Sequence, residues 1–279
     1  MTYNEVIIRG GLGNQIFCLL QAYRILLKGN KNIFLNNSVY GYHKRQDRPF
    51  LLKSLYPDLL KDFVISKRKR GFISYFFARI IEKYFMFSQK NRIPGDKSFS
   101  INFLNIYKLY CGYFQNIDDN QLDQKALNLL ITKVQHNLKE PTINKLAIHI
   151  RRGDFCSPLN PNHGLIQEKY IYEEAKIMLT KTNFDGITIF TDSPEMIDIN
   201  IFKSLELKVE IDNTNDNIIL FKKMLNHKGL IASNSTLSLW AGVIGRIKYF
   251  SLPKYWMKNV NSDLIGLSYV RRYNCNEIL

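Results

Sequence analysis

The chain has 279 residues, 46% of them hydrophobic and 23% charged, so it can bury a sizeable core in one large domain or in two of about 140 residues each. Its formal net charge of +15 favours a partner that carries negative charge, such as a nucleic acid, anionic lipid or a polyanionic small molecule. The N-terminal stretch MTYNEVIIRGG lacks the apolar segment of a signal peptide, and no run of about 18 apolar residues occurs. The four cysteines form no CxxC pair, which argues against structural zinc, and the sequence as a whole predicts a soluble cytoplasmic protein.

Buried-type strands alternate with helical patterns along the chain, which predicts an α/β fold with parallel sheets. Glu140-Pro141 interrupts the pattern and is the best boundary between a lobe over residues 1–140 and a lobe over residues 141–279. In the first lobe we expect strands over residues 6–8, 32–35 and 106–114, and helices over residues 15–27 and 118–138. In the second lobe we expect strands over residues 146–150, 186–190, 205–209 and 229–232, and helices over residues 168–180, 217–226 and 237–244.

Ligands of parallel α/β sheets bind beyond the carboxyl ends of the strands, so the residues that follow each strand are candidates for a site. The first strand runs into the glycine-rich turn Gly10–Gln15. This turn is not a dinucleotide fingerprint, because Ile16 stands where the third glycine belongs, and no Lys-Ser/Thr follows to make a P-loop. Backbone N–H groups at the start of the next helix could bind an anion or a hydroxyl, although a plain strand-to-helix turn is the alternative.

The stretch HIRRGDF, residues 149–155, follows the first strand of the second lobe. The guanidinium groups of Arg151 and Arg152 offer rigid forks that match phosphate oxygens, so the pair could bind the pyrophosphate of a nucleotide-sugar. Negative charge grows on such a leaving group as the sugar–oxygen bond breaks, and fixed cations help most in that situation. The alternatives are an ion pair with Asp154 or a solvated basic loop.

Two further strand ends carry polar residues. Asp192 ends a buried strand and could accept two hydrogen bonds from the edge of a guanine, but the following Ser193-Pro194 favours a helix N-cap when this stretch is taken alone. Ser233–Thr236 precedes a helix, where its hydroxyls and amide could hold a phosphate or act as an ordinary cap.

Five motifs of the chain are Gly11–Gln15, Gly112–Gln115, His149–Asp154, Phe190–Asp192 and Ser233–Thr236 with Trp240. In order and spacing, and over nearly the whole length, they resemble the motifs of the bacterial α-1,2-fucosyltransferases of glycosyltransferase family 11. The HxRRxD motif is the most specific of them. Two departures concern the shape of the pocket: Ser193 stands where many members have a second aspartate, and Leu239-Trp240 replaces a double tryptophan.

The resemblance implies a fold of the GT-B type, with two Rossmann-like lobes that face a cleft. It assigns the acceptor side to residues 1–140 and the binding of GDP-fucose to residues 141–279. The implied reaction moves L-fucose, with inversion, to a terminal galactose of a glycan such as an O-antigen or capsule repeat. No metal or other cofactor is implied, and the chain has no Asp-x-Asp triplet to hold a divalent ion at the diphosphate.

The resemblance also implies roles for single residues. Arg151 would contact the β-phosphate, and Arg152 would support it or shape the loop. His149 and Asp192 would read the guanine, although His149 could instead be a strand histidine with internal partners. The phosphate-side motif corresponds to Asn234, Ser235 and Thr236.

In the first lobe, Gly13, Asn14 and Gln15 match residues that face the diphosphate and the acceptor, and Asn14 is a candidate for the catalytic machinery. The motifs do not settle which group deprotonates the acceptor hydroxyl. Asp154 is the first candidate, and a phosphate oxygen of the donor is the rival.

A basic cluster joins a bulky apolar one in the stretch KRKRGFISYFFARII, which begins at Lys67. Interfacial helices have this composition, so peripheral contact of residues 67–87 with the inner face of the plasma membrane is one interpretation. A core helix preceded by a solvated charge run is the other, and the composition slightly favours it. The alternative function is a non-catalytic basic protein that binds a membrane surface or a nucleic acid. Nucleic acid is not expected, because the basic residues are spread through the chain and no nucleic-acid module is present.

Overall fold

The computed structural model describes residues 2–42, 49–66, 68–85, 99–118, 120–135, 141–156, 163–257, 260–261, 266–267 and 269–275. The chain forms two compact units, Met1–Asn137 and Leu138–Leu279. The boundary expected from the sequence, Glu140-Pro141, lies a few residues after this division. The functions assigned to the two lobes stay predictions.

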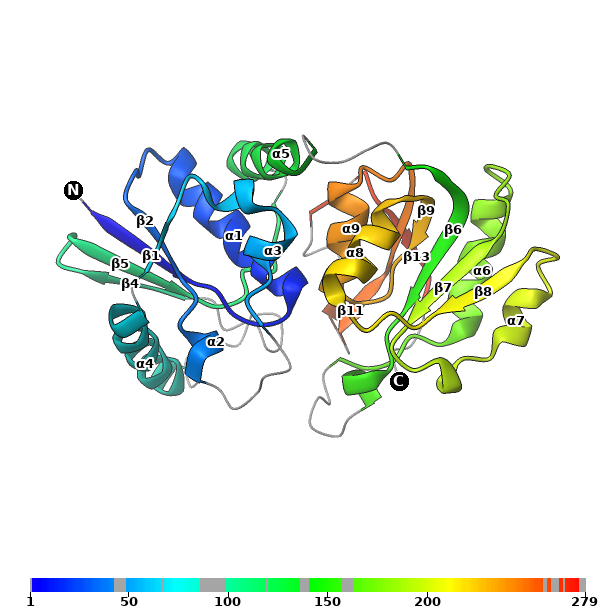
Figure 1. The fold of residues 1–279 in the computed structure, drawn as a ribbon, viewed down its shortest axis with the longest axis horizontal. Coiled ribbons are helices and arrows are strands. Elements are labelled where there is room, and N and C mark those ends of the chain that lie inside the picture. Colours follow the sequence, from blue (N-terminus) through cyan, green and yellow to red (C-terminus); the bar gives the residue numbers. More distant parts are fainter. Residues whose placement is uncertain are drawn as a thin grey trace. The chain divides into compact units, whose positions relative to one another are not determined.

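The first unit is built on a five-stranded sheet with the order β3-β2-β1-β5-β4, in which only β4 runs antiparallel to its neighbour (Figure 1). One face of the sheet carries α4, and α1 covers the other face. The strands are β1 (Tyr3–Ile7), β2 (Ile33–Asn36), β3 (Val64–Ile65), β4 (Phe99–Phe103) and β5 (Tyr107–Cys111). The helices are α1 (Leu12–Leu27), α2 (Val39–Tyr42), α3 (Leu52–Leu55), η1 (Pro57–Leu60), α4 (Arg68–Phe85) and α5 (Gln121–Gln135).

A buried ion pair joins α1 to α5 in the first unit. Arg24 Nη2 lies 2.7 Å from Asp123 Oδ2, and Arg24 Nε donates to Asp123 Oδ1 at 2.8 Å. The same carboxylate accepts the backbone N–H of Asp118 at 2.7 Å. Because both charges are paired and hydrogen-bonded, the helices can pack closely around groups that would otherwise be costly to bury.

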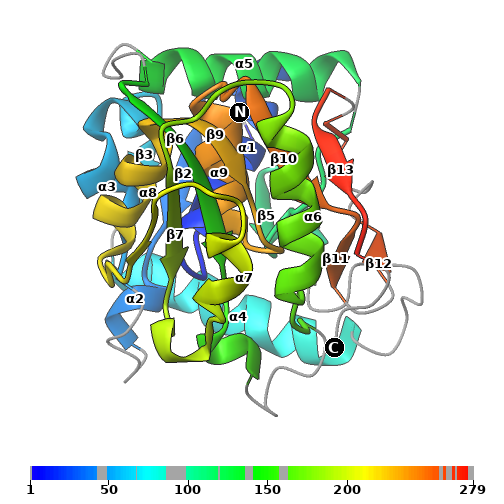
Figure 2. The same cartoon turned by 90° about the vertical axis from the view of Figure 1, so that its right-hand side faces the viewer.

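The second unit is built on a six-stranded parallel sheet with the order β13-β10-β9-β6-β7-β8, and Figure 2 shows β9, β6 and β7 side by side at its centre. Helices α6 and α7 cover one face, and α8 and α9 cover the other (Figure 1). The main strands are β6 (Ile143–Ile150), β7 (Ile187–Thr191), β8 (Val209–Asp212), β9 (His227–Ile231), β10 (Tyr249–Pro253) and β13 (Arg271–Tyr273), beside a small β11 (Tyr255–Met257) and β12 (Val260–Asn261) ribbon. The helices are η2 (Gly153–Cys156), α6 (Glu168–Leu179), η3 (Pro194–Met196), α7 (Ile199–Lys203), α8 (Asn217–Leu225) and α9 (Thr236–Ile244).

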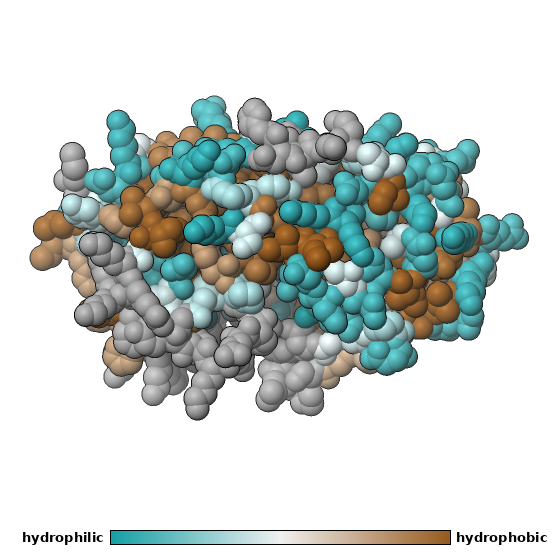
Figure 3. Space-filling model, viewed as in Figure 1, coloured by the Kyte–Doolittle hydropathy of each residue, from teal (hydrophilic) through white to brown (hydrophobic). Residues whose placement is uncertain are grey.

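The polarity of the surface and the length of the helices concern contact of the chain with water and with membranes. On the face drawn in Figure 3, polar side chains are interspersed with apolar ones in both units. No helix within the described ranges is long and apolar enough to cross a membrane.

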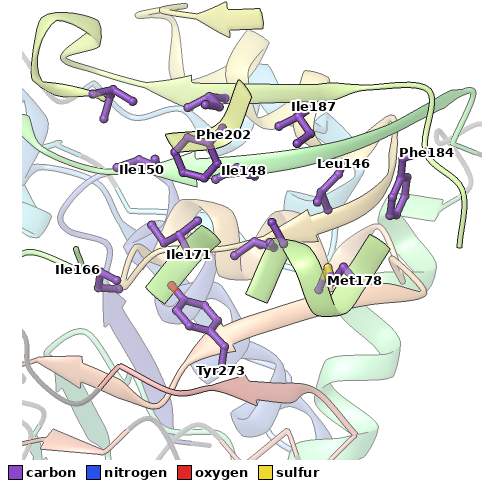
Figure 4. Packing of buried hydrophobic residues seen from close by; sticks show 14 of the residues in the cluster. Leu146, Ile148, Ile150, Ile166, Ile171, Met178, Phe184, Ile187, Phe202 and Tyr273 are labelled. Atoms are coloured by element: carbon purple, nitrogen blue, oxygen red, sulfur yellow. The ribbon is translucent and has the colours of Figure 1, made fainter. Parts of the chain in front are cut away.

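The core of the second unit explains why β6 reads as a nearly continuous apolar run. Strands that are buried on both faces carry apolar residues at successive positions, as central strands of parallel sheets do. Ile148 and Ile150 of β6 pack with Ile171 of α6 and Phe202 of α7, as Figure 4 shows. The opposite face of β6 carries Ala147 and His149, so within residues 146–150 the one polar side chain is that of His149, which points toward α9.

The expected α/β class, with two lobes built on parallel sheets, is confirmed by these sheets and their helices. The cleft between the lobes stays a prediction. The strand expected over residues 205–209 is wrong in its position, because β8 begins at Val209 and ends at Asp212. Glu206 has a φ of 58°, a left-handed conformation that closes the turn after α7 and cannot continue a strand. The sequence patterns missed the short or peripheral strands β3, β4, β10 and β13.

Candidate functional site

Three of the expected motifs follow three neighbouring strands of the second unit. Strand β6 lies between β9 and β7, and all three run parallel, so their carboxyl ends meet at one edge of the sheet. Ile150 is paired with Thr191 in the register of β6 and β7. The next residue of each strand is Arg151 or Asp192, and the register therefore brings these two side chains together.

Arg151 and Asp192 form an ion pair at this edge. Arg151 Nη1 lies 2.9 Å from Asp192 Oδ2, and both side chains remain partly exposed to solvent. Asp192 Oδ1 also accepts the backbone N–H of Arg152 at 2.9 Å. A short helix, η3, does start after Ser193 as the N-cap interpretation expected, but Ser193 makes no side-chain capping bond and Asp192 is not the N-cap residue. Asp192 instead ties Arg151 to the loop that follows β6.

Arg152 has a different environment from Arg151, although both residues directly follow the end of β6. Its side chain is buried, and Nη2 lies 2.6 Å from Glu168 Oε1 at the start of α6. A second amino group, Nη1, donates to the carbonyl oxygen of Arg151 at 3.2 Å. The geometry favours a supporting role for Arg152. Glu168 was not singled out in the sequence, where the only signal was an acidic residue in the first turn of an expected helix.

Gly153 explains why the loop needs a glycine after the two arginines. A Cβ atom at this position would lie 2.3 Å from Asp192 Oδ2, so any other residue would displace the carboxylate that pairs with Arg151. The backbone N–H of Gly153 donates to Ser193 Oγ at 3.4 Å, so the loop is held by two consecutive residues of the β7 end. Asp154 follows in η2, but its side chain lies outside the described part of the structure, and its role as the base stays a prediction.

His149 is buried near the end of β6. Its Nδ1 lies 2.9 Å from Ser238 Oγ and 3.1 Å from Ser233 Oγ. Burial, and then the positive charge of Arg151, lower the pKa of His149 to about 3, so the imidazole is neutral at physiological pH. The two serine hydroxyls are the partners of Nδ1, as expected for a strand histidine with internal partners. Recognition of guanine by His149 stays a prediction.

The segment after β9 divides into an internal and an accessible part. Ser233 and Asn234 are buried, and Asn234 Nδ2 donates to the carbonyl oxygens of His163 at 3.0 Å and Gly164 at 3.3 Å. Ser235 and Thr236 are partly exposed at the start of α9. The two residues at the helix N-terminus are therefore better placed for a phosphate than the two before them.

An aromatic stack beside Arg151 was not foreseen from the sequence. The rings of Phe155 and His163 are stacked, with centroids 4.7 Å apart and planes inclined by 7°. Arg151 Cζ lies 5.9 Å from the centroid of Phe155, within the range of a cation–π contact. No local pattern links the two rings, because they come from opposite ends of a segment whose middle residues, 157–162, lie outside the described part.

The glycine-rich turn of the first unit connects β1 to α1 as expected. Gly10 has a φ of +80°, and its carbonyl oxygen accepts the hydroxyl of Tyr40 at 2.9 Å. Asn14 Oδ1 accepts from Gln115 Nε2 at 2.8 Å, which brings two of the expected motifs together. Arg9, which the sequence did not single out, lies with Cζ 4.9 Å from the ring centroid of Tyr113.

Gln15 and Gly13 are buried in this unit, unlike Asn14. The Gln15 amide donates to the carbonyl of Pro49 at 2.8 Å and accepts the N–H of Leu51 at 2.9 Å. These bonds anchor the segment that leads into α3. Asn14 is therefore the best placed of the three for a ligand, and contact of the other two with a donor or acceptor stays a prediction.

A pocket of about 570 Å³ opens elsewhere in the second unit, between α6 and β13. It is lined by Tyr170, Glu174, Lys254 and Arg271, among others, and by none of the predicted site residues. Glu174 is buried and accepts from Arg271 Nε at 2.8 Å. Arg271 is thus already paired with a buried carboxylate at this pocket, and none of the predicted site residues lines it.

The polar run 212–217 serves the packing of α8. Asp212 Oδ2 lies 2.6 Å from Lys223 Nζ, and Asp216 caps α8 by accepting the N–H groups of Ile218 and Ile219. Within the described ranges, no group of three or more His, Cys, Asp and Glu side chains is placed to hold a metal ion. Metal independence stays a prediction.

No family model matches the chain, and no curated protein matches it either. Among solved structures, the chain is similar to the crystal structure of the glycosyl transferase family 9 from Veillonella parvula DSM 2008. The two share 11% sequence identity with a TM-score of 0.35, and the match covers 86% of this chain and 78% of that one. A likeness of this size leaves family and activity open, so the resemblance to family 11 depends on the motifs themselves.

Proposed function

We propose that this protein is a glycosyltransferase that transfers L-fucose from GDP-β-L-fucose, with inversion, to the 2-hydroxyl of a terminal galactose in a glycan such as an O-antigen or capsule repeat. The observation that carries the proposal is Arg151. It lies partly exposed where three parallel strands end, within an HxRRxD motif and against Asp192. A nucleotide diphosphate is the anion that best suits a single guanidinium in this position.

Arg151 supports the departure of GDP in this proposal. As the fucose–oxygen bond breaks, negative charge accumulates on the β-phosphate, and a fixed cation stabilises that charge more than it stabilises the resting donor. A guanidinium has five N–H donors, so Arg151 can hold Asp192 and a phosphate oxygen at the same time. The partly exposed Ser235 and Thr236 would add hydroxyl and backbone donors at the N-terminus of α9.

The neighbours of Arg151 set its position. The buried Arg152–Glu168 pair joins the loop to α6, and Asp192 binds the loop on its other side. Asp192 and His149 are proposed to recognise the guanine, Asp192 through its carboxylate and His149 as a neutral imidazole. Asn14, Gln15 and Gly13 are proposed to serve the acceptor side from the first unit.

Inversion requires the acceptor hydroxyl to attack from the face opposite the leaving GDP, and a base must accept its proton. Asp154 is the proposed base, with a phosphate oxygen of the donor as the rival. An Asp154→Asn variant separates them, since loss of a side-chain base should lower kcat by about 10²-fold or more, whereas a phosphate base leaves kcat within about tenfold.

The central experiment measures hydrolysis and transfer of GDP-fucose, GDP-mannose and UDP-galactose by the purified chain, followed by a screen of galactose-terminated acceptors. We expect turnover of GDP-fucose alone, unchanged by excess EDTA, because arginine rather than a divalent ion neutralises the diphosphate. A loss of more than about tenfold in EDTA that Mg²⁺ or Mn²⁺ restores would contradict the metal-independent mechanism. If no sugar nucleotide binds, the non-catalytic basic protein with a charge of +15 is the function that remains.

A further inference from the structure

Helix α4 of the first unit is held against its sheet by one side only. Gly71 and Ala78 on this side are buried, and the carbonyl oxygen of Gly71 accepts from Asn36 Nδ2 at 2.7 Å. Ser74 Oγ, on the same side, donates to the buried Glu5 at 3.2 Å. These contacts fix the rotation of α4 about its axis, so its opposite side must face outward.

The outward side of α4 is apolar rather than polar. Ile73, Phe76, Phe77 and Ile80 are 69%, 58%, 41% and 41% exposed, although a helix on a soluble surface normally presents charged residues there. Their spacing of three and four residues places them in one stripe along the helix. Phe77 also packs against Phe103, with ring centroids 5.4 Å apart.

The charges of α4 are arranged unfavourably for an isolated helix. Arg68, Lys69 and Arg70 form its first turn, which contains no acidic residue. Positive charges at this end oppose the helix macrodipole, so a negatively charged partner would stabilise the helix. Along its whole length α4 carries five basic residues and one acidic residue, Glu82.

Further apolar side chains are exposed next to α4 in the chain or in the fold. Val64 and Ile65 form β3, which immediately precedes the helix, and both are exposed. Leu104 and Ile106 are exposed in the turn between β4 and β5, beside the Phe103 that contacts α4. Exposed apolar side chains therefore occur at both edges of this sheet as well as on α4.

We infer that α4 binds the surface of an anionic phospholipid bilayer, with Ile73, Phe76, Phe77 and Ile80 in the boundary between headgroups and acyl chains. An anionic bilayer offers negative charge and an apolar interior within a few ångströms of each other, which matches the basic first turn and the apolar stripe of one helix. A nucleic acid would match the charge but not the stripe. The inference does not depend on the proposed function.

The test is sedimentation of the full chain with vesicles of phosphatidylcholine that contain about 30% phosphatidylglycerol, and with vesicles of phosphatidylcholine alone. We expect binding to the anionic vesicles that weakens at high salt, and a loss of about tenfold or more in the double variant Ile73→Asn/Phe76→Asn. Ile219→Asn is the matched control, because Ile219 is 50% exposed on α8 in the other unit and should not change binding. Arg68→Gln/Lys69→Gln/Arg70→Gln should remove the preference for anionic lipid.

Melting curves and far-ultraviolet circular dichroism show whether each variant is folded, and both should match the unchanged protein. Failure of the unchanged chain to bind anionic vesicles, or equal binding by the Ile73→Asn/Phe76→Asn variant, would overturn the inference. So would a dimer in solution that this double variant converts to a monomer, since a second copy would then cover the stripe.

Discussion

Each unit contains an arginine–aspartate pair, and the two pairs differ in their access to water. In the first unit Arg24 and Asp123 lie 2.7 Å apart, with side chains that are 8% and 6% exposed. In the second unit Arg151 and Asp192 lie 2.9 Å apart, with side chains that are 29% and 21% exposed. The chemistry is the same in both places, but only the second pair can be reached by a ligand.

The comparison shows that residue type alone does not identify a binding group. Arg24 lies in the last turn of α1 and Asp123 in the first turn of α5, where packing of the two helices excludes water and the pair contributes to the fold. Arg151 and Asp192 sit where strands end, so solvent or an anion can replace the packing partners. Variants of each pair should therefore affect different properties.

The largest effect on stability is expected for Asp123→Asn in the first unit. Removal of one partner leaves Arg24 as an uncompensated buried charge, which should lower the free energy of unfolding by about 3–5 kcal/mol in urea titrations. The control is Asp58→Asn, because the exposed Lys61–Asp58 pair should contribute less than about 1 kcal/mol. Equal effects of the two substitutions would show that burial does not distinguish these pairs.

The largest effect on activity is expected for Arg151→Lys in the second unit. Lysine keeps the charge but loses the planar fork, so kcat should fall by about 10²-fold or more. Affinity for GDP-fucose should fall only about tenfold, and the melting temperature should change little because the pair is partly exposed. A rise in KM with kcat intact would mean that Arg151 only holds the resting substrate.

The Arg152→Lys variant can be compared with Arg151→Lys, because the two arginines are adjacent in the chain but differ in burial. Arg152 is buried against Glu168, so its substitution should lower stability while reducing kcat less than Arg151→Lys does. Steady-state kinetics and melting curves on both variants decide between the two roles. A larger loss of kcat for Arg152→Lys would reverse the assignment.

The Asp192→Asn variant tests whether the partly exposed aspartate recognises the guanine base or only positions Arg151. If its carboxylate accepts from guanine, calorimetry should show GDP binding weakened by about 1.5–3 kcal/mol, with ADP and UDP weak from the start and little changed. If Asp192 only holds Arg151 and the N–H of Arg152, all three nucleotides should change together. That second result would remove Asp192 from base recognition.

A smaller effect of pH follows from His149. Its folded-state pKa, lowered to about 3 by burial, lies below the unfolded value of about 6.5, so the unfolded chain binds a proton that the folded chain does not. The free energy of unfolding should therefore fall by about 1.4 kcal/mol per pH unit as pH decreases below 6.5. His149→Gln should flatten this dependence in urea titrations at pH 7, 6 and 5. An identical slope in the variant would assign the loss to other groups, such as the buried His227, whose pKa burial also lowers.

Most of the fold could be predicted from the sequence where local patterns are strong. The long helix α1 and the central strands β6, β7 and β9 were expected within a few residues, because their apolar periodicity or continuous apolar runs are set by burial in one environment. Short edge strands such as β3 and β13 were not expected. Such strands depend on a neighbour for their hydrogen bonds, and two or three residues carry no period of their own.

The sequence by itself determined the chemistry at the strand ends: two adjacent arginines, an aspartate and a run of hydroxyls, each placed after a strand. Only the tertiary structure decided how these groups are used. The parallel register of β6 and β7 pairs Arg151 with Asp192, and the packing of α6 supplies Glu168 to bury Arg152. The reason is that burial and partnership are properties of strands brought together from distant parts of the chain, whereas a sequence pattern reports only on its own neighbours.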